Sequence, residues 1–141
     1  MDRSEFGKSA EDAAAEYLEK RGLKILAQNW EARAKPIDPW RQGRRIGEID
    51  IIARKGGAFV FVEVKAGKEG EIDPSVHVTP KKQAKLRMLA QWWLMQNKKE
   101  GSEYQIDVVV VREKRGLPAE AFGAKAGDFE IEHFERAVVG K

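Results

Sequence analysis

Hydrophobic spacing predicts helices at two places along the chain. Residues 4–21 contain no proline, place Ala14, Ala15 and Leu18 on one helical side, and end at Gly22, a residue common just past a helix. Residues 80–97 follow Thr79 and begin with Pro80, the arrangement of a capped helix start. Apolar residues occupy a broad side of this second helix, so we expect it to cover a sheet.

Runs of β-branched and aromatic residues predict strands at 23–30, 48–53, 58–65 and 104–111, with an edge strand at 129–134. The turn residues Gly56 and Gly57 should join the second and third strands as an antiparallel hairpin. Residues 106–111 are almost continuously apolar, as in a strand buried on both faces. We therefore expect a three-layer α/β/α fold with a central mixed sheet, loops at 67–78 and 112–128, a long loop marked by Pro36, Pro39 and Gly43, and a frayed tail.

Length and composition indicate one folded domain, residues 1–141. The chain is 42% apolar and 35% charged, and it contains no cysteine. Disulfides, iron–sulfur clusters and a cysteine nucleophile are thereby excluded. No apolar run approaches the roughly 18 residues of a membrane-spanning helix, and the first residues lack the apolar core of a signal peptide. We expect a cytoplasmic protein that does not interact with membranes.

Positive charge is concentrated in the long loop, although the net charge of the chain is only +3. Asp38 is the single acidic residue among five cations, which are Arg33, Lys35, Arg41, Arg44 and Arg45. Cations interleaved with an aromatic residue, here Trp40, suit phosphate contact with base stacking. The alternative is a solvated loop whose tryptophan packs on the body of the protein. No G-x-x-x-x-G-K-[ST] pattern is present, which excludes a P-loop.

The predicted hairpin carries the most informative polar residues. Asp50 lies in one strand, and Glu63 and Lys65 lie near the end of its partner. Period-two alternation places Glu48, Asp50 and Ile52 on one face, and a tight turn brings Asp50 and Glu63 to the same end. Converging carboxylates with a backbone carbonyl and water suit Mg²⁺. The alternative is an ordinary ion pair of Lys65 with Glu63 or Asp50.

The sequence Asp50, then Glu63-x-Lys65, resembles the PD-(D/E)XK nuclease superfamily, although Ile49 stands in place of the proline. A closer resemblance is to the bacterial YraN family, over roughly residues 5–111. It rests on the segments 7–11, 47–53 (GEIDIIA), 61–65 (FVEVK), 78–83 (VTPKKQ) and 106–109 (IDVV), together with Asn29. That family is similar to the archaeal Holliday junction resolvases. The long loop before Gly47 departs from the family pattern.

The resemblance implies a restriction endonuclease-like fold and hydrolysis of DNA, branched or otherwise structured, with Mg²⁺ or Mn²⁺. Asp50 and Glu63 would hold the metal with the Val64 carbonyl, and Lys65 would orient the attacking water. The resemblance also assigns Gln83 a place near this lysine and implies a homodimer. Glu11 would be an outer carboxylate that holds a water of the metal; the alternative is a boundary residue that reaches solvent.

The remaining polar residues divide into DNA contacts and structural positions. We expect DNA phosphate to meet Arg41, Arg44 and Arg45 in the loop and Lys81 and Lys82 at the start of the second helix, which otherwise is a solvated turn. We expect Asp107 to be structural, His77 and His133 to be bystanders, and Trp92 and Trp93 to lie in the core. Two other functions stay open: a DNA-binding or scaffold module with idle carboxylates, and a nuclease acting on RNA or single strands.

Overall fold

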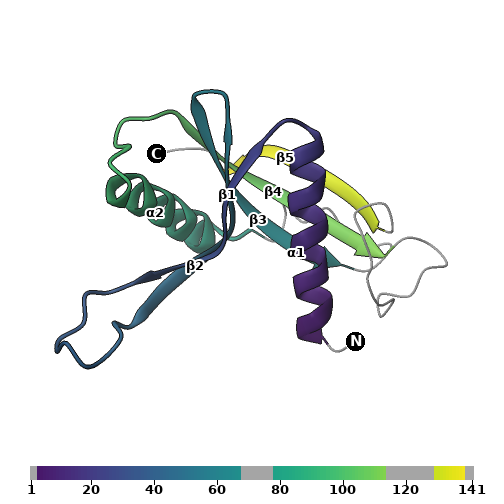
Figure 1. Ribbon diagram of the computed structural model, residues 1–141. Coiled ribbons are helices and arrows are strands. Elements are labelled where there is room, and N and C mark those ends of the chain that lie inside the picture. Colours follow the sequence, from purple (N-terminus) through teal and green to yellow (C-terminus); the bar gives the residue numbers. More distant parts are fainter. Residues whose placement is uncertain (1–2, 68–77, 114–128, 139–141) are drawn as a thin grey trace.

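A five-stranded sheet with one helix on each face forms the molecule (Figure 1). The computed structural model describes residues 3–67, 78–113 and 129–138. The helices are α1 (Arg3–Lys20) and α2 (Pro80–Gln96), and the strands are β1 (Lys24–Arg33), β2 (Arg45–Lys55), β3 (Ala58–Gly67), β4 (Tyr104–Glu113) and β5 (Phe129–Val138). The strands lie in sequence order, and all neighbours are antiparallel except β3 and β4, which α2 connects. The predicted α/β class with a mixed sheet is confirmed.

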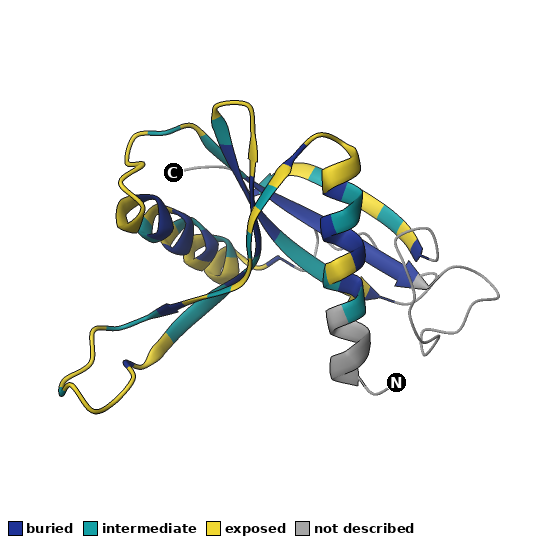
Figure 2. Cartoon of the chain, in the orientation of Figure 1, coloured by how far each residue is buried: buried dark blue, intermediate teal, exposed yellow. Residues whose placement is uncertain are grey.

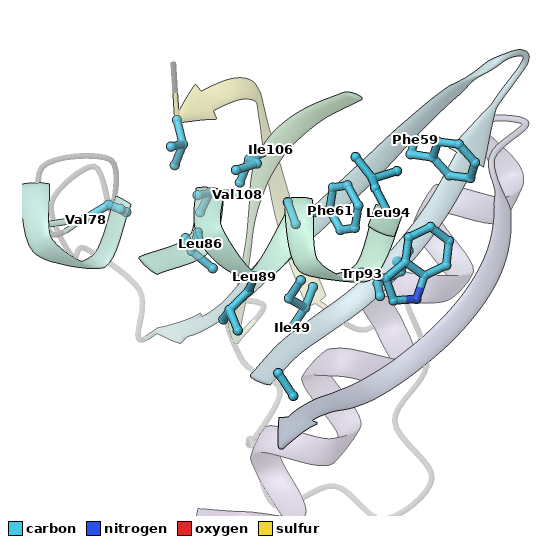
Figure 3. Packing of buried hydrophobic residues seen from close by; sticks show 14 of the residues in the cluster. Ile49, Phe59, Phe61, Val78, Leu86, Leu89, Trp93, Leu94, Ile106 and Val108 are labelled. Atoms are coloured by element: carbon cyan, nitrogen blue, oxygen red, sulfur yellow. The ribbon is translucent and has the colours of Figure 1, made fainter. Parts of the chain in front are cut away.

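Each face of the sheet has its own hydrophobic core. Alanines and Leu18 of α1 pack on the face that includes Ile51, Val62 and Val109. On the other face, α2 packs Leu89 and Trp93 against a cluster that includes Ile49, Ile52, Phe61 and Val108 (Figure 3). Residues of β4 contribute alternately to both clusters, so the prediction of a strand buried on both faces is confirmed. Trp93 lies in the core as predicted, whereas Trp92 is half-buried at its margin.

Local signals account for the start of α2 and for the turn of the β2–β3 hairpin. The Thr79 hydroxyl accepts a hydrogen bond from the Lys82 amide at 3.1 Å, and Pro80 occupies the first turn. Gly56 has φ 60°, a left-handed conformation that glycine adopts without strain, and it lets the strands pair from Lys55 and Ala58 onward. Both predictions are confirmed.

The pairing of β2 with β3 ends at Ile51 and Val62, and beyond this point β2 continues beside β1 alone. Ile49 and Ile52 lie in the same core cluster although they are three residues apart. Strict alternation along residues 48–52, which the hairpin pattern predicted, is therefore wrong at this point. At this point β2 loses its partner β3, and on its other side Asn29 of β1, between the partners of Ile51 and Ile49, has φ 54°, which is not strand geometry.

Several element boundaries differ from those predicted. β1 runs to Arg33 and β2 begins at Arg45, so the long loop is the tip of a two-stranded arm (Figure 1). Arg112 belongs to β4 rather than to a loop, and β5 extends to Val138, which is buried opposite Ile106. Residues 68–77 with His77, residues 114–128 and the tail from 139 lie outside the described residues. No helix in the described ranges is long and apolar enough to cross a membrane.

Asp107 is a structural residue, as predicted. Its side chain is 1% exposed and accepts hydrogen bonds from the Gln105 side-chain amide at 2.9 Å and from the Arg136 backbone amide at 2.9 Å. Its second oxygen lies 2.7 Å from Nε2 of His133. His133 thus joins β5 to a buried carboxylate of β4, and it lies outside the acidic group of the candidate site described below.

Candidate functional site

The candidate site lies where β2 leaves β3. Once cross-strand pairing stops, the Val64 amide donates instead to the Asp50 carboxylate, with 2.8 Å between N and Oδ2. Asp50 comes directly before Ile51, and Glu63 comes directly after Val62. Because Ile51 and Val62 are the last pair of these antiparallel strands, both carboxylates lie at the same end of the hairpin. The predicted convergence of these two carboxylates is confirmed.

Three carboxylates form a tight group at this opening. Oxygen atoms of Glu11, Glu48 and Asp50 all lie within 4.8 Å of one another. Glu11 comes from α1, on the side of the buried Ala14, so the prediction that this helical face carries Glu11 to the site is confirmed in its geometry. Glu48 was missed as a site residue. Its signal was present in the sequence, because Glu48 and Asp50 are two residues apart in one strand.

Glu63 and Glu48 pair with cations, whereas Asp50 and Glu11 accept hydrogen bonds from neutral groups. The Lys82 ammonium lies 2.7 Å from Glu63, whose side chain is only 12% exposed, and Arg45 lies 2.8 Å from Glu48. Among the residues whose side chains the structure describes, no cation pairs with Asp50 or Glu11; their hydrogen-bond donors are the Val64 amide and the Asn29 side chain. Two half-buried carboxylates thus rely on neutral donors.

Asn29 is a second residue that sequence reasoning did not assign to the site. It has φ 54°, in the left-handed region, and it lies between the residues of β1 that pair with Ile51 and Ile49 of β2. Asparagine tolerates this conformation better than most residues. The local backbone therefore places the Asn29 amide beside Glu11, and no helical or strand periodicity reveals such a placement.

The uncompensated charges alter the acidity of the site. Burial, followed by the nearby charge of Glu63, raises the pKa of Asp50 from 3.8 to about 8, although the Val64 hydrogen bond opposes this rise. Burial also raises the pKa of Glu11, while the Asn29 hydrogen bond lowers it and the charge of Glu48 raises it further. Without a cation, the site therefore retains a proton on Asp50 at neutral pH.

The acidic group opens into a pocket of about 410 Å³ between β2 and α2. Acidic, basic and apolar side chains share its walls, which are formed by Arg45, Ile46, Gly47, Glu48, Asp50, Glu63, Lys82, Lys85, Leu86 and Leu89. A Cβ atom at Gly47 would lie 2.9 Å from Leu89 Cδ1, so glycine allows α2 to approach β2 closely. The pocket thus combines carboxylates that suit a hard cation with cations that suit an anionic ligand.

The other predicted site residues lie around this pocket or apart from it. Lys65 is half-buried and forms no ion pair with another described residue, so the predicted alternative, a Lys65–Glu63 or Lys65–Asp50 pair, is wrong. The side-chain amide of Gln83 donates to the Val78 carbonyl at 2.8 Å. Lys81 is exposed at the start of α2.

In the arm, Arg44 is exposed and Arg41 lies 3.8 Å from Asp38. Trp40 is 90% exposed. The proposed packing of Trp40 on the body of the protein is therefore wrong.

The fold and the pocket define an α/β protein with an acidic cluster at a split in a mixed sheet, beside the basic start of a helix. The chain belongs to the family described as "Uncharacterised protein family UPF0102", which matches residues 10–111. A "UPF0102 protein" of Tropheryma whipplei (strain Twist) is 41% identical over 103 residues, 73% of this chain and 74% of that protein. Similar relatives occur in Caldicellulosiruptor saccharolyticus, 35% identical over 79% of this chain and 85% of the relative, and in Mycolicibacterium vanbaalenii, 39% identical over 78% and 82%.

Proposed function

We propose that the protein is a Mg²⁺- or Mn²⁺-dependent nuclease of the PD-(D/E)XK superfamily, with a restriction endonuclease-like fold, that hydrolyses phosphodiester bonds in DNA. One observation carries the proposal. Four carboxylates from α1, β2 and β3 converge at the split in the sheet, and two of them, Asp50 and Glu11, have no cationic partner among the residues whose side chains the structure describes. Half-buried carboxylates without compensation are costly unless a cation binds.

The donor set fits a hard divalent cation. Asp50, Glu48 and Glu11 offer oxygen atoms close enough together to share one ion, and Glu63 with the Val64 carbonyl would complete the set. Such an ion would supply a Lewis acid for a phosphoryl oxygen and would lower the pKa of a bound water. A role confined to binding DNA or to acting as a scaffold is less favoured, because it does not offset the cost of holding these carboxylates close together and half-buried.

The cations of the site would act on the phosphate. Lys65 would orient the attacking water and stabilise charge that develops on the phosphate. Lys82 forms an ion pair with Glu63. If a metal ion neutralised that carboxylate instead, Lys82 would be free to bind phosphate. Gln83 would hold the start of α2 through the Val78 carbonyl and so keep Lys82 in place.

The surrounding basic residues favour DNA as the ligand. Lys81 and Lys82 at the start of α2, with Arg41, Arg44 and Arg45 of the arm, would contact phosphates on both sides of the pocket. We include branched or otherwise structured DNA in the proposal, as well as a homodimer, since two cuts in a four-way junction need two sites. Light scattering tests the dimer.

A nuclease assay with linear, flapped and four-way DNA in Mg²⁺ or Mn²⁺ tests the function. Asp50→Ala and Glu63→Ala should abolish cleavage while DNA binding stays intact or strengthens, because each change removes a charge that repels phosphate. Lys65→Ala should lower kcat roughly 100-fold or more, the loss expected for one transition-state donor. Wild-type turnover in either carboxylate variant would refute the proposal. Cleavage of RNA alone would refute the DNA substrate, and cleavage of single strands alone would refute the branched or structured substrate.

A further inference from the structure

The arm formed by β1 and β2 ends in two apolar side chains that no described part of the chain covers. Most of the tip of this arm is exposed (Figure 2). Trp40 is 90% exposed and Ile37 is fully exposed, whereas Trp93 is buried and Trp30 and Trp92 are half-buried. A tryptophan side chain presents about 150–250 Å² of surface, so leaving it in water forgoes a large hydrophobic gain. The tip therefore suits a binding partner better than it suits solvent.

Hydrogen bonds hold the base of the tip, which we call the neck, where Arg33 and Ala34 face Gly43 and Arg44. The Ala34 amide donates to the Arg44 carbonyl at 2.8 Å, and the Arg33 guanidinium donates to the Gly43 carbonyl at 3.0 Å. A Cβ atom at Gly43 would lie 1.6 Å from the Ala34 carbonyl oxygen, so only glycine fits there. Beyond the neck, the backbone amide of Trp40 donates to the Asp38 carboxylate at 3.0 Å. Trp40 is thus presented by an ordered turn.

The charges of the tip indicate the chemistry of its partner. Lys35, Arg41 and Arg44 flank Trp40, and Asp38 is the one acidic residue of segment 34–44, which gives this segment a net charge of +2 (three cations minus one anion). The arm is also continuous with the pocket, because β2 supplies both Arg45 at the neck and Glu48 in the pocket wall. A polyanion held at the pocket can therefore extend along the arm.

We propose that Trp40, with Ile37, is a stacking wedge for unpaired or unstacked DNA bases, while the flanking cations bind phosphates. Aromatic side chains stack on bases of any identity, whereas entering an intact duplex requires bases to be unstacked first. Resting on the proposed function, this inference names its substrate class: DNA that carries unpaired bases to one side of the phosphate held in the pocket. Arg45 is five residues from Asp50, roughly 17 Å along a strand and so about five base-pair steps. The unpaired base should lie at least that far from the phosphate.

Binding of 2-aminopurine oligonucleotides to the whole chain in EDTA tests the wedge without any hydrolysis. The probe base is placed in a single strand, in an unpaired bulge or in a fully paired duplex. Trp40→Ala should weaken binding to the first two forms roughly 5- to 100-fold and leave binding to the duplex and the salt dependence almost unchanged. Trp40→Phe should retain most of the affinity. Arg44→Gln is the matched control: it should weaken binding to all three forms alike and lower the salt slope by about one.

Two results would overturn the wedge. One is equal weakening, or none, of all three DNA forms by Trp40→Ala. The other is self-association of the wild type, but not of Trp40→Ala, in sedimentation, since the tip would then bind a second copy of the chain. The proposed nuclease function fails separately. Absence of cleavage in Mg²⁺ or Mn²⁺ with the predicted loss of binding in Trp40→Ala would refute hydrolysis and leave the wedge standing.

Discussion

Asp50 makes the protein without metal less stable at neutral pH, and replacing it with asparagine should remove this penalty. Burial and the charge of Glu63 raise the pKa of Asp50 from 3.8 to about 8. An acid with a higher pKa in the folded state holds its proton more tightly when folded, so stability falls as pH rises from about 4 and levels off above about 8. At pH 7 the difference from an unfolded pKa of 3.8 corresponds to on the order of 4 kcal/mol in the free energy of unfolding.

The variant Asp50→Asn keeps the shape of the side chain, and its amide oxygen can accept the hydrogen bond from the Val64 amide. In EDTA, urea unfolding should therefore show the variant to be more stable than the wild type at pH 7, by up to about 4 kcal/mol. The gap should close as the pH falls toward 4. Asp12→Asn, at an exposed position next to Glu11 in α1, is the matched control and should show no comparable gap.

Metal binding should displace the proton of Asp50. Titration calorimetry in buffers of different ionisation enthalpy should show release of about one proton per metal ion at pH 7 and little release at pH 9, since the pKa is about 8. Asp50→Asn should lose this release. A variant less stable than the wild type at pH 7, or a gap that does not depend on pH, would refute the reasoning, because Asp50 would then be an ordinary ionised carboxylate.

Two further changes test other carboxylates. Glu11→Gln keeps the volume of the side chain but removes its charge. It should raise the metal concentration needed for half-maximal cleavage, with little change in Tm. An unaltered metal dependence would mean that Glu11 is a boundary residue that reaches solvent. Asp107→Ala leaves the Arg136 amide and His133 without their buried acceptor. In urea unfolding it should lower the free energy of unfolding by about 2–4 kcal/mol, and Asp107→Asn should recover part of this loss. A decrease below about 1 kcal/mol would mean that this network adds little to stability.

The parts of the fold that sequence predicted well depend on local interactions. Gly56 and Gly57 define a tight turn, and this turn determines which residues of β2 and β3 pair. The position of Asp50 and Glu63 at the same end of the hairpin therefore follows from the sequence. Thr79 and Pro80 mark the start of α2 in the same local way. Each of these predictions needed only residues that are close together in the chain.

The parts that sequence did not predict depend on contacts between distant elements. Lys82 neutralises Glu63 because Leu86 and Leu89 pack α2 against the sheet at one particular height, and no spacing in the sequence encodes that height. The extension of β1 to Arg33 was missed for another reason. Of residues 31–33 only Ala32 is apolar and buried, between the charged Glu31 and Arg33, so this end of β1 carries too short an apolar pattern to be told from a loop in the sequence.

The neck of the arm divides the molecule into parts that natural selection can change independently. No residue of segment 34–44 belongs to either hydrophobic cluster, and the Ala34–Arg44 hydrogen bond closes the segment at its base. Insertions, deletions and exchanges between Lys35 and Gln42 therefore leave the neck, the cores and the carboxylate pocket intact. A lineage can acquire a new ligand preference at the tip while it inherits the same chemistry at the split in the sheet, and a protein engineer can graft a different tip at the same two residues.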